Sequence, residues 1–312
     1  MQSIIFVHTG NSFYLHLAIK QAKKTNPNID IILLGDGSNK SVTREGALHF
    51  YVSDYFHRAE ELDHYFINHS PNARHYELFC FQRWLVIWEF IKKNPQYDDK
   101  FVYCDTDTLL FADVTKDLEQ LGNHPLALEE EVGPAFTFFN KGTLDEFCNT
   151  IEWFYKEEEG KRYVCNFIEE KRKANAIHGF SDMYAFEYYV RNVRRGEVID
   201  AMKNYRGGWG EVQEGNTLPL SRYDQNVNFK EDFTLTPEGI KKFEFIDGKP
   251  YCYSVVLKEY IQFKCIHFQG KAKYEMLKFC NEPMPFLSEN WFQYYIIYNL
   301  KKIKRKIWKR HL

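Results

Sequence analysis

The chain has 312 residues, 44% hydrophobic and 17% aromatic, which is enough core material for one large α/β domain or two small ones. Its net charge of −2 conceals a basic tail, because residues 294–312 hold seven of the 41 Lys and Arg residues and no acid, leaving 34 basic against 43 acidic residues elsewhere. This is not the charge distribution of a general nucleic-acid binder, and no apolar stretch reaches the roughly 18 residues of a membrane span.

The cysteines and the first residues indicate where the protein resides. The seven cysteines are scattered, odd in number and never in a Cys-x-x-Cys pair, which favours reduced core thiols. Residues 1–8 are too short and too uncharged for a signal peptide. We therefore expect a cytoplasmic protein.

The first half of the chain alternates between strand and helix patterns. Apolar runs predict strands at residues 4–8, 29–34 and 48–52, and helices are expected from residue 12 or 13, at 55–68 and at about 74–93. Such a βαβ opening predicts a parallel sheet.

Polar residues follow the first two strands at their carboxyl ends, where ligands bind in open α/β sheets. Candidates for holding a base and a ribose are therefore Thr9, Gly10, Asn11 and Asp36. Asp36 stands between two glycines, so an ordinary turn is the alternative explanation for it.

The helix at 74–93 is apolar on nearly all sides. Between Leu78 and Ile91 only Gln82, Arg83 and Glu89 are polar. At 100° per residue Gln82 and Glu89 share one edge, whereas Arg83 lies about 100° away among apolar side chains. A guanidinium there must meet a carboxylate or a ligand anion. We expect Arg83 either to form a structural ion pair or to contact the sugar or phosphate of a bound ligand.

An apolar strand at residues 100–104 leads directly into Asp105-Thr106-Asp107. A buried strand holds two carboxylates only at its end, where water or a metal ion takes up the charge. Two hard oxygen ligands beyond a strand end suit Mg²⁺ or Mn²⁺ carrying a diphosphate. We interpret Asp105 and Asp107 as metal ligands for a nucleotide-sugar donor, with Thr106 between them as a donor-binding residue.

The second half is less regular. We expect strands at 134–140, 251–256 and 260–267, helices at 144–155 and 183–191, and a long loop at 205–224 whose Trp209 forms a flap or a packing anchor. Ser181 is the expected cap of the helix at 183–191. Asp182 is the candidate catalytic or acceptor-side carboxylate, the alternative being an aspartate stabilised by the helix dipole.

A second strand ends in a metal-capable side chain, His267. Gly270 permits a close backbone approach, and Lys271 and Lys273 can neutralise a leaving diphosphate. Alone, a histidine is more often a satisfied core residue. Because imidazole joins carboxylates readily at manganese sites, His267 is predicted to complete a metal site with the two aspartates.

These motifs together resemble a GT-A fold glycosyltransferase. They are Thr9-Gly10-Asn11 after the first strand, Arg83 in its buried helix, the Asp105-Thr106-Asp107 strand end and His267-Phe268-Gln269-Gly270. Their order is similar to that of the retaining enzymes of glycosyltransferase family 8, over about residues 1–275. The resemblance implies a Rossmann-like, mostly parallel sheet flanked by helices, manganese bound by Asp105, Asp107 and His267, and a diphosphate contact from Lys273.

Two segments depart from the family pattern. Pro134–Asn140 stands where the family has Asn-Ser-Gly, and Gly179–Met183 stands where it has Asp-Gln-Asp. The later Asp224-Gln225-Asn226 is similar in letters only. These departures leave the sugar, the acceptor and the stereochemistry open.

The predicted activity is metal-dependent transfer of a sugar from a nucleoside-diphosphate sugar to a glycan or a lipid-linked saccharide. The resemblance favours a UDP-sugar and retention of configuration. The predicted site comprises Asp182 and Arg83 in catalysis, Mn²⁺ or Mg²⁺ on Asp105, Asp107 and His267, and donor binding by Thr9, Gly10, Asn11, Asp36, Arg83, Thr106, Gly270, Lys271 and Lys273. One GT-A-type domain is expected over residues 1–286, with a nucleotide-binding half at about 1–115 and an acceptor half at about 116–286.

Residues 287–312 are predicted to form an amphipathic basic helix. Its apolar stripe comprises Ile296, Leu300, Ile303 and Ile307, and most of its Lys and Arg residues lie on the far side. Such a helix either lies on an anionic membrane surface, which would make the protein peripheral on the inner face, or packs on its own domain.

Three other activities compete with this prediction. Asp105-Thr106-Asp107-Thr108 matches the nucleophile motif of haloacid-dehalogenase-type phosphatases, but that motif normally opens its domain, whereas about 100 residues precede it here. A nucleotidyltransferase would need a Gly-rich basic loop after the first strand, which the sequence lacks. A non-catalytic sugar-nucleotide binding module would not need a metal at the diphosphate.

Overall fold

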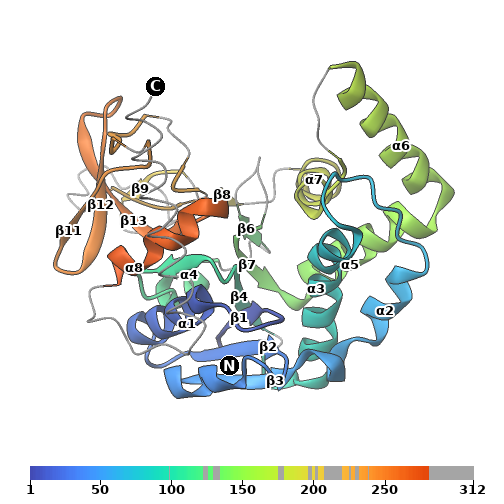
Figure 1. The fold of residues 1–312 in the computed structure, drawn as a ribbon, viewed down its shortest axis with the longest axis horizontal. Coiled ribbons are helices and arrows are strands. Elements are labelled where there is room, and N and C mark those ends of the chain that lie inside the picture. Colours follow the sequence, from blue (N-terminus) through green and yellow to red (C-terminus); the bar gives the residue numbers. More distant parts are fainter. Residues whose placement is uncertain are drawn as a thin grey trace, which may run out of the picture.

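The computed structural model describes residues 1–97, 99–121, 126–128, 134–174, 179–195, 199–200, 203–206, 220–224, 226–228, 232–237 and 239–280. Its centre is a seven-stranded sheet in the order β3-β2-β1-β4-β7-β6-β8 (Figure 1). The strands are β1 Ser3–Val7, β2 Asp30–Gly35, β3 Ala47–Tyr51, β4 Lys100–Cys104, β6 Leu126–Leu128, β7 Phe136–Asn140 and β8 Ile199–Asp200.

Most neighbouring strands of this sheet are parallel. β1 runs parallel to both β2 and β4, β3 runs parallel to β2, and β8 runs parallel to β6. Only β7 runs against its neighbours, β4 and β6. The predicted fold class, an α/β protein with a mostly parallel sheet flanked by helices, is confirmed.

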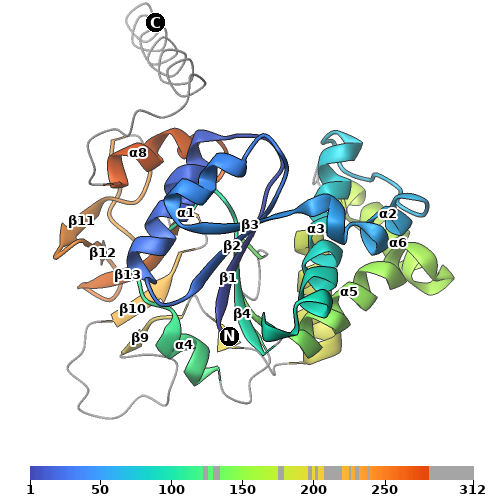
Figure 2. The ribbon, with the colours of Figure 1, turned by 90° about the horizontal axis from the view of Figure 1, so that it is seen from below.

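Helices cover both faces of the sheet (Figure 2). One face carries α1 Phe13–Thr25 and α4 Thr115–Gln120, and the other carries α3 Arg74–Lys93, α5 Lys141–Lys156 and α7 Asp182–Tyr188. Side chains of β1 alternate between the two cores, with Ile4 and Phe6 in the first and Ile5 and Val7 in the second. Because both faces are buried, the strand is a continuous apolar run, as is usual in parallel sheets.

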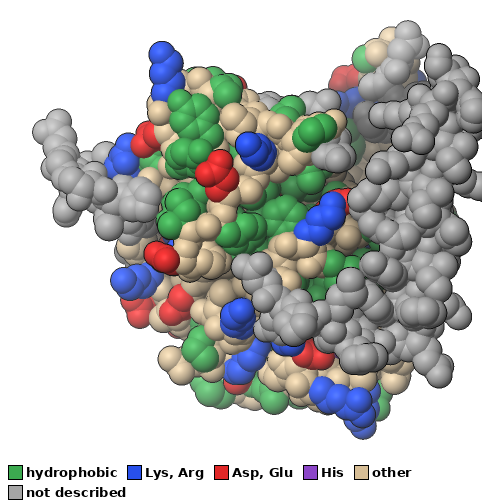
Figure 3. All heavy atoms as spheres, turned by 60° about the vertical axis from the view of Figure 1, so that its left-hand side comes forward, with side chains coloured by type: hydrophobic (Ala, Val, Ile, Leu, Met, Phe, Trp, Pro, Cys, Tyr) green, Lys and Arg blue, Asp and Glu red, His purple; other side chains and the backbone are tan. Residues whose placement is uncertain are grey.

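A second sheet packs beside the first core. It contains β11 Phe243–Ile246, β12 Lys249–Ser254, β13 Glu259–His267, β10 Leu220–Tyr223 and β9 Tyr205–Arg206, and the short β5 Thr108–Leu110 pairs with β13. The outer side of this region shows hydrophobic side chains among charged ones (Figure 3). Its exposed hydrophobic residues include Ile246, Val255, Val256, Leu257 and Tyr260.

The prediction of a loop at 205–224 is wrong at both ends, where the short strands β9 and β10 form. Tyr205 pairs with Ser221 in an antiparallel ladder, and Ser221 pairs in turn with Gln262 of β13. Both strands are short and depend on partners far away in sequence, so local patterning gives no signal for them. Trp209 lies outside the described residues.

The remaining helices differ in part from the prediction. The helix expected at 55–68 is shorter, comprising a 3₁₀ turn at Val52–Tyr55 and α2 His57–Asp63. Helix α6 Glu158–Lys173 is absent from the sequence prediction. Helix α7 continues as a π-helical turn at Tyr189–Arg194. The short α8 comprises Met276–Phe279. Ser181 takes the N-cap position of α7, but no side-chain capping bond forms there.

No helix among the described residues combines the length and the apolarity needed to cross a membrane. The helix predicted at 287–312 lies outside the described residues. Its contact with an anionic membrane surface therefore stays a prediction.

Candidate metal centre

The aspartate pair lies at the carboxyl end of β4, near the middle of the main sheet. The Asp105 amide donates to the Ala135 carbonyl oxygen at 2.7 Å, which extends the pairing of β4 with β7 by one residue. The Asp105 carbonyl then accepts from the Thr108 amide at 3.0 Å and turns the chain into β5. The two carboxylates thus sit on a tight turn between two strands, as the sequence pattern predicts.

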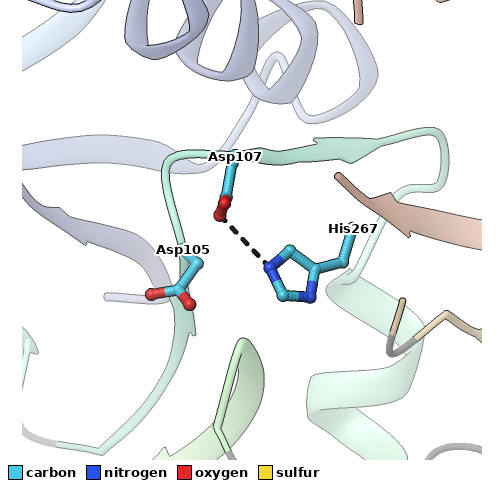
Figure 4. A group of neighbouring side chains, drawn as sticks. All are labelled: Asp105, Asp107 and His267. Carbon is cyan, nitrogen blue, oxygen red and sulfur yellow. Dashed lines mark ion pairs between the residues drawn. The ribbon is translucent and has the colours of Figure 1, made fainter. Parts of the chain in front are cut away.

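Pairing of β5 with β13 brings His267 to this turn, although about 160 residues separate it from the aspartates. Thr108 is the register partner of His267, and the Phe268 amide donates to the Asp107 carbonyl oxygen at 2.8 Å. His267 Nε2 lies 3.3 Å from Asp107 Oδ1 (Figure 4). The antiparallel register of β5 and β13 therefore places the His267 side chain beside Asp107.

Asp105, Asp107 and His267 can hold one metal ion together. One donor atom from each lies within 4.8 Å of the others, and all three residues are buried or half-buried. Two carboxylate oxygens and one imidazole nitrogen suit Mn²⁺, whereas oxygen-preferring Mg²⁺ would rely more on the carboxylates. The structure therefore brings the three predicted ligands together, and the donor set fits the predicted ion.

Asp107 lies in a strongly positive setting. Lys273 Nζ lies 3.1 Å from Asp107 Oδ2. Burial by itself would raise the pKa of Asp107, but His267 and Lys273 outweigh it and hold the pKa well below its usual value. Burial would likewise lower the pKa of Lys273, and the charge of Asp107 raises it instead. Both groups are therefore charged at neutral pH.

Asp105 belongs to a hydrogen-bond network with Arg83 and Asp182. Arg83 Nη1 donates to Asp105 Oδ1 at 2.8 Å, and Arg83 Nη2 donates to Asp182 Oδ2 at 2.7 Å. Asp182 Oδ2 also accepts from Trp84 Nε1 at 3.3 Å. Burial raises the pKa of Asp182, and the charge of Arg83 only partly offsets it. Of the two roles expected for Arg83, the structure shows the ion pair, and a contact with ligand stays a prediction.

A cavity of about 490 Å³ opens at this centre. Charged, polar and apolar residues line it: Tyr76, Cys80, Arg83, Asp105, Asp107, Pro134, Ala135, Asp182, Met183, Asn226, His267, Gln269, Gly270 and Lys273. Seven of the predicted site residues therefore line this cavity: Arg83, Asp105, Asp107, Asp182, His267, Gly270 and Lys273.

Sequence reasoning missed several cavity residues that carried a signal. Tyr76 and Cys80 stand seven and three residues before Arg83, which places them on the same face of α3. Asn226 belongs to a run that resembles the family motif in letters only. Its amide donates to the Gln269 side chain, which is the link that brings this segment to the cavity wall.

The residues predicted to hold the nucleoside are not among those that line this cavity. Asp36 Oδ2 accepts from the Gly10 amide at 2.6 Å and Asp36 Oδ1 accepts from the Ser38 amide at 2.8 Å, so its carboxylate stabilises the turn. Gly10 has φ +83°, which explains the glycine there. Asn11 pairs with His16 Nε2 at 3.0 Å. Nucleoside binding by Thr9, Gly10, Asn11 and Asp36 stays a prediction.

Thr106 and Lys271 also lie outside the cavity lining. The Thr106 hydroxyl hydrogen-bonds to His8 Nδ1 at 3.1 Å, and His8 Nε2 hydrogen-bonds to the Ser12 hydroxyl at 3.1 Å. Lys271 is exposed. His8, which was not predicted as a site residue, thus joins the turn of the aspartates to the loop after β1.

Acid should destabilise the protein through His8. Burial, with Lys273 nearby, lowers the pKa of His8 from 6.5 to about 4. The unfolded chain therefore takes up a proton below about pH 6.5 that the folded protein refuses, and the free energy of unfolding falls as the pH drops through this window. Between pH 7.5 and pH 4.5 we expect His8 to account for about 2 to 3 kcal/mol of the loss.

Urea unfolding at both pH values, in EDTA, measures this contribution. His8→Asn should reduce the acid-induced loss by that amount, whereas His64→Asn, a change at an exposed histidine, should not. Equal pH dependence in the wild type and in His8→Asn would show that His8 is not held neutral.

No protein-family model and no curated protein matches the chain significantly. Solved structures do match it. The galactosyltransferase LgtC in complex with donor and acceptor sugar analogues is 14% identical, with coverage of 94% of this chain and 99% of that chain and a TM-score of 0.47.

Two further solved structures are similar to the chain. Mouse xyloside xylosyltransferase 1 is 10% identical, with 65% of this chain and 85% of that chain covered and a TM-score of 0.46. A glycosyltransferase involved in glycosylation of the major capsid of PBCV-1 is 11% identical, with 89% and 98% covered and a TM-score of 0.41. All three are glycosyltransferases, the class that the sequence resembles. An activity has to be argued from the site itself.

Proposed function

We propose that the protein is a metal-dependent glycosyltransferase that uses a nucleoside-diphosphate sugar as donor. The observation that supports this most strongly is the Asp105, Asp107 and His267 group at the edge of a cavity, with Lys273 beside it. A nucleoside diphosphate carries concentrated negative charge, which a divalent cation and a lysine together can neutralise.

The charged residues of the site have different roles in this proposal. When bound, Mn²⁺ or Mg²⁺ would act as a Lewis acid on the diphosphate, held by Asp105, Asp107 and His267. Lys273 adds a positive charge beside Asp107, where negative charge grows on the departing diphosphate. Arg83 and Asp182 line the cavity and offer an N–H donor and a carboxylate oxygen to the hydroxyl groups of a sugar.

The reaction that this arrangement suits is displacement at the anomeric carbon. An acceptor hydroxyl forms the new glycosidic bond, the bond to the diphosphate oxygen breaks, and the nucleoside diphosphate leaves with its electron pair. The hydroxyl proton passes to the leaving phosphate or to a base. Much of the rate would come from holding donor and acceptor in place.

The finer assignments rest on the resemblance. It favours UDP as the nucleotide, retention of configuration, and a glycan or lipid-linked saccharide as acceptor. A panel of UDP-sugars incubated with the protein and Mn²⁺ tests the proposal, because a transferase should release UDP slowly to water and faster with a suitable acceptor. Release that is equally fast in EDTA would reject a metal-dependent transferase.

Lys273 and Lys271 provide a matched test of the leaving-group contact. We expect Lys273→Met to lower kcat for UDP release about tenfold to a hundredfold, because its charge is half-buried beside Asp107. Lys271→Met removes an identical side chain two residues away that is exposed and outside the cavity lining, and kcat should stay nearly unchanged. Steady-state kinetics at saturating Mn²⁺ compares the two, and equal effects would contradict the assignment of Lys273.

A further inference from the structure

Tyr103 lies behind the candidate metal centre and does not line its cavity. It precedes Asp105 by two residues, so both side chains project from the same face of the chain. The Tyr103 side chain is buried, and its ring packs edge-on against Trp84 with centroids 4.4 Å apart. Whatever Tyr103 does for ligand binding, it does through another residue.

The Tyr103 hydroxyl and Arg83 hold one oxygen of Asp105 between them. Arg83 Nη1 donates to Tyr103 Oη at 2.8 Å and to Asp105 Oδ1 at 2.8 Å. The hydroxyl in turn donates to Asp105 Oδ1. These three polar groups form a closed triangle in the interior, so none of them can reorient without breaking a buried hydrogen bond.

This triangle leaves the two oxygens of Asp105 unequal. Among contacts between described residues, those to the Asp105 carboxylate fall on Oδ1, which leaves Oδ2 as the oxygen available to a cation. Arg83 is itself restrained, because Asp182 Oδ2 accepts from its Nη2 at 2.7 Å. The guanidinium therefore cannot turn both of its terminal nitrogens toward Asp105.

We propose that Tyr103 is a positioning residue that fixes Asp105 as a one-oxygen ligand and thereby sets the affinity of the centre for Mn²⁺. Without the hydroxyl, Asp105 Oδ1 would be held by Arg83 Nη1 alone, and the carboxylate could rotate about that single contact. Oδ2 would then no longer be held in one position for the cation. The inference rests on the proposed metal site and extends it to a residue outside the cavity.

The test is calorimetric titration of the protein with Mn²⁺ alone, without a nucleotide. Tyr103→Phe should raise the Kd for Mn²⁺ about tenfold to a hundredfold, the usual cost of losing a partner that orients a metal ligand. A lower rate of UDP release should recover when the Mn²⁺ concentration is raised. Asp182→Leu should raise the Kd in the same direction, because it removes the acceptor of Arg83 Nη2 and frees the guanidinium to turn toward Asp105.

Tyr97→Phe is the matched control. Tyr97 is also buried, and its hydroxyl donates to Asp30 Oδ2 at 2.9 Å, a contact with no part in the cavity. This variant loses the same kind of hydrogen bond and should bind Mn²⁺ as the wild type does. Urea unfolding of both variants shows whether either one is misfolded.

The outcomes separate this inference from the proposed function. A wild-type protein that binds no Mn²⁺ would overturn both. If the wild type binds Mn²⁺ and Tyr103→Phe binds it equally well, only the role of Tyr103 is overturned. If Tyr103→Phe does not fold, Asp182→Leu decides, and an unchanged Kd in that variant overturns the inference.

Discussion

Asp107→Asn should abolish metal-dependent turnover while the protein stays folded. We expect the rate of Mn²⁺-dependent UDP release to fall by about a thousandfold, because the substitution removes the charge on the ligand that also pairs with His267 and Lys273. The amide keeps the shape of the carboxylate, so packing around β5 should survive. Rates measured from low to high Mn²⁺ show whether any metal concentration restores activity.

Asp54→Asn is the control for that experiment. Asp54 is exposed, away from the cavity lining, and loses the same charge when substituted. Its turnover should equal that of the wild type. Full activity in Asp107→Asn, with Mn²⁺ still required, would remove Asp107 from the metal site and leave the proposed centre without its most buried carboxylate.

Arg83→Met should cause the largest loss of stability among the site variants. The guanidinium is buried between two carboxylates, at 2.8 Å from Asp105 and 2.7 Å from Asp182. Removing one partner of a buried pair leaves the other charge uncompensated, which costs about 3 to 5 kcal/mol. Asp182 bears most of this cost, because its side chain is only 5% exposed.

A second substitution tests this explanation. Arg83→Met combined with Asp182→Leu removes the stranded charge and should recover a large part of the lost free energy of unfolding, since apolar replacements of buried pairs are often neutral. Urea unfolding of the two single variants and the double variant forms a double-mutant cycle. A loss below about 1 kcal/mol in Arg83→Met, or no recovery in the double variant, would show that the network does not depend on this ion pair.

Element bounds are predicted most accurately from the sequence where the hydrophobic pattern and the charge change at the same residue. The helix at 74–93 and the strand at 100–104 have the predicted bounds, because a long apolar run ends in charged or polar residues at each. The meeting of Asp105, Asp107 and His267 was anticipated by combining two strand ends with a family resemblance. Neither strand end alone determines that β5 and β13 are neighbours.

What local pattern could not supply was pairing between distant segments. β9 and β10 are short and gain their place only from each other and from β13. Helix α6 was missed because its buried stripe is narrow: Gly160, Val164 and Ile168 are its buried residues, and charged side chains dominate the rest. In such elements tertiary contacts decide the structure.

Within the site, the sequence could identify residue types but not their partners. Arg83 was expected to meet either a carboxylate or a ligand, and the structure shows two carboxylates. Tyr103 went unnoticed although its spacing from Asp105 places both on one face of the chain. The sequence allows Asp36 to be a nucleotide ligand or a turn residue, and its hydrogen bonds favour the turn.

The central claim is that one divalent cation binds jointly to Asp105, Asp107 and His267. Anomalous diffraction from crystals soaked with Mn²⁺ and UDP measures this directly, because manganese is located independently of the protein density. The account predicts a single strong peak within coordination distance of all three side chains, with the diphosphate on its open side. A peak held by other residues, or none at this centre while UDP is bound, would contradict it.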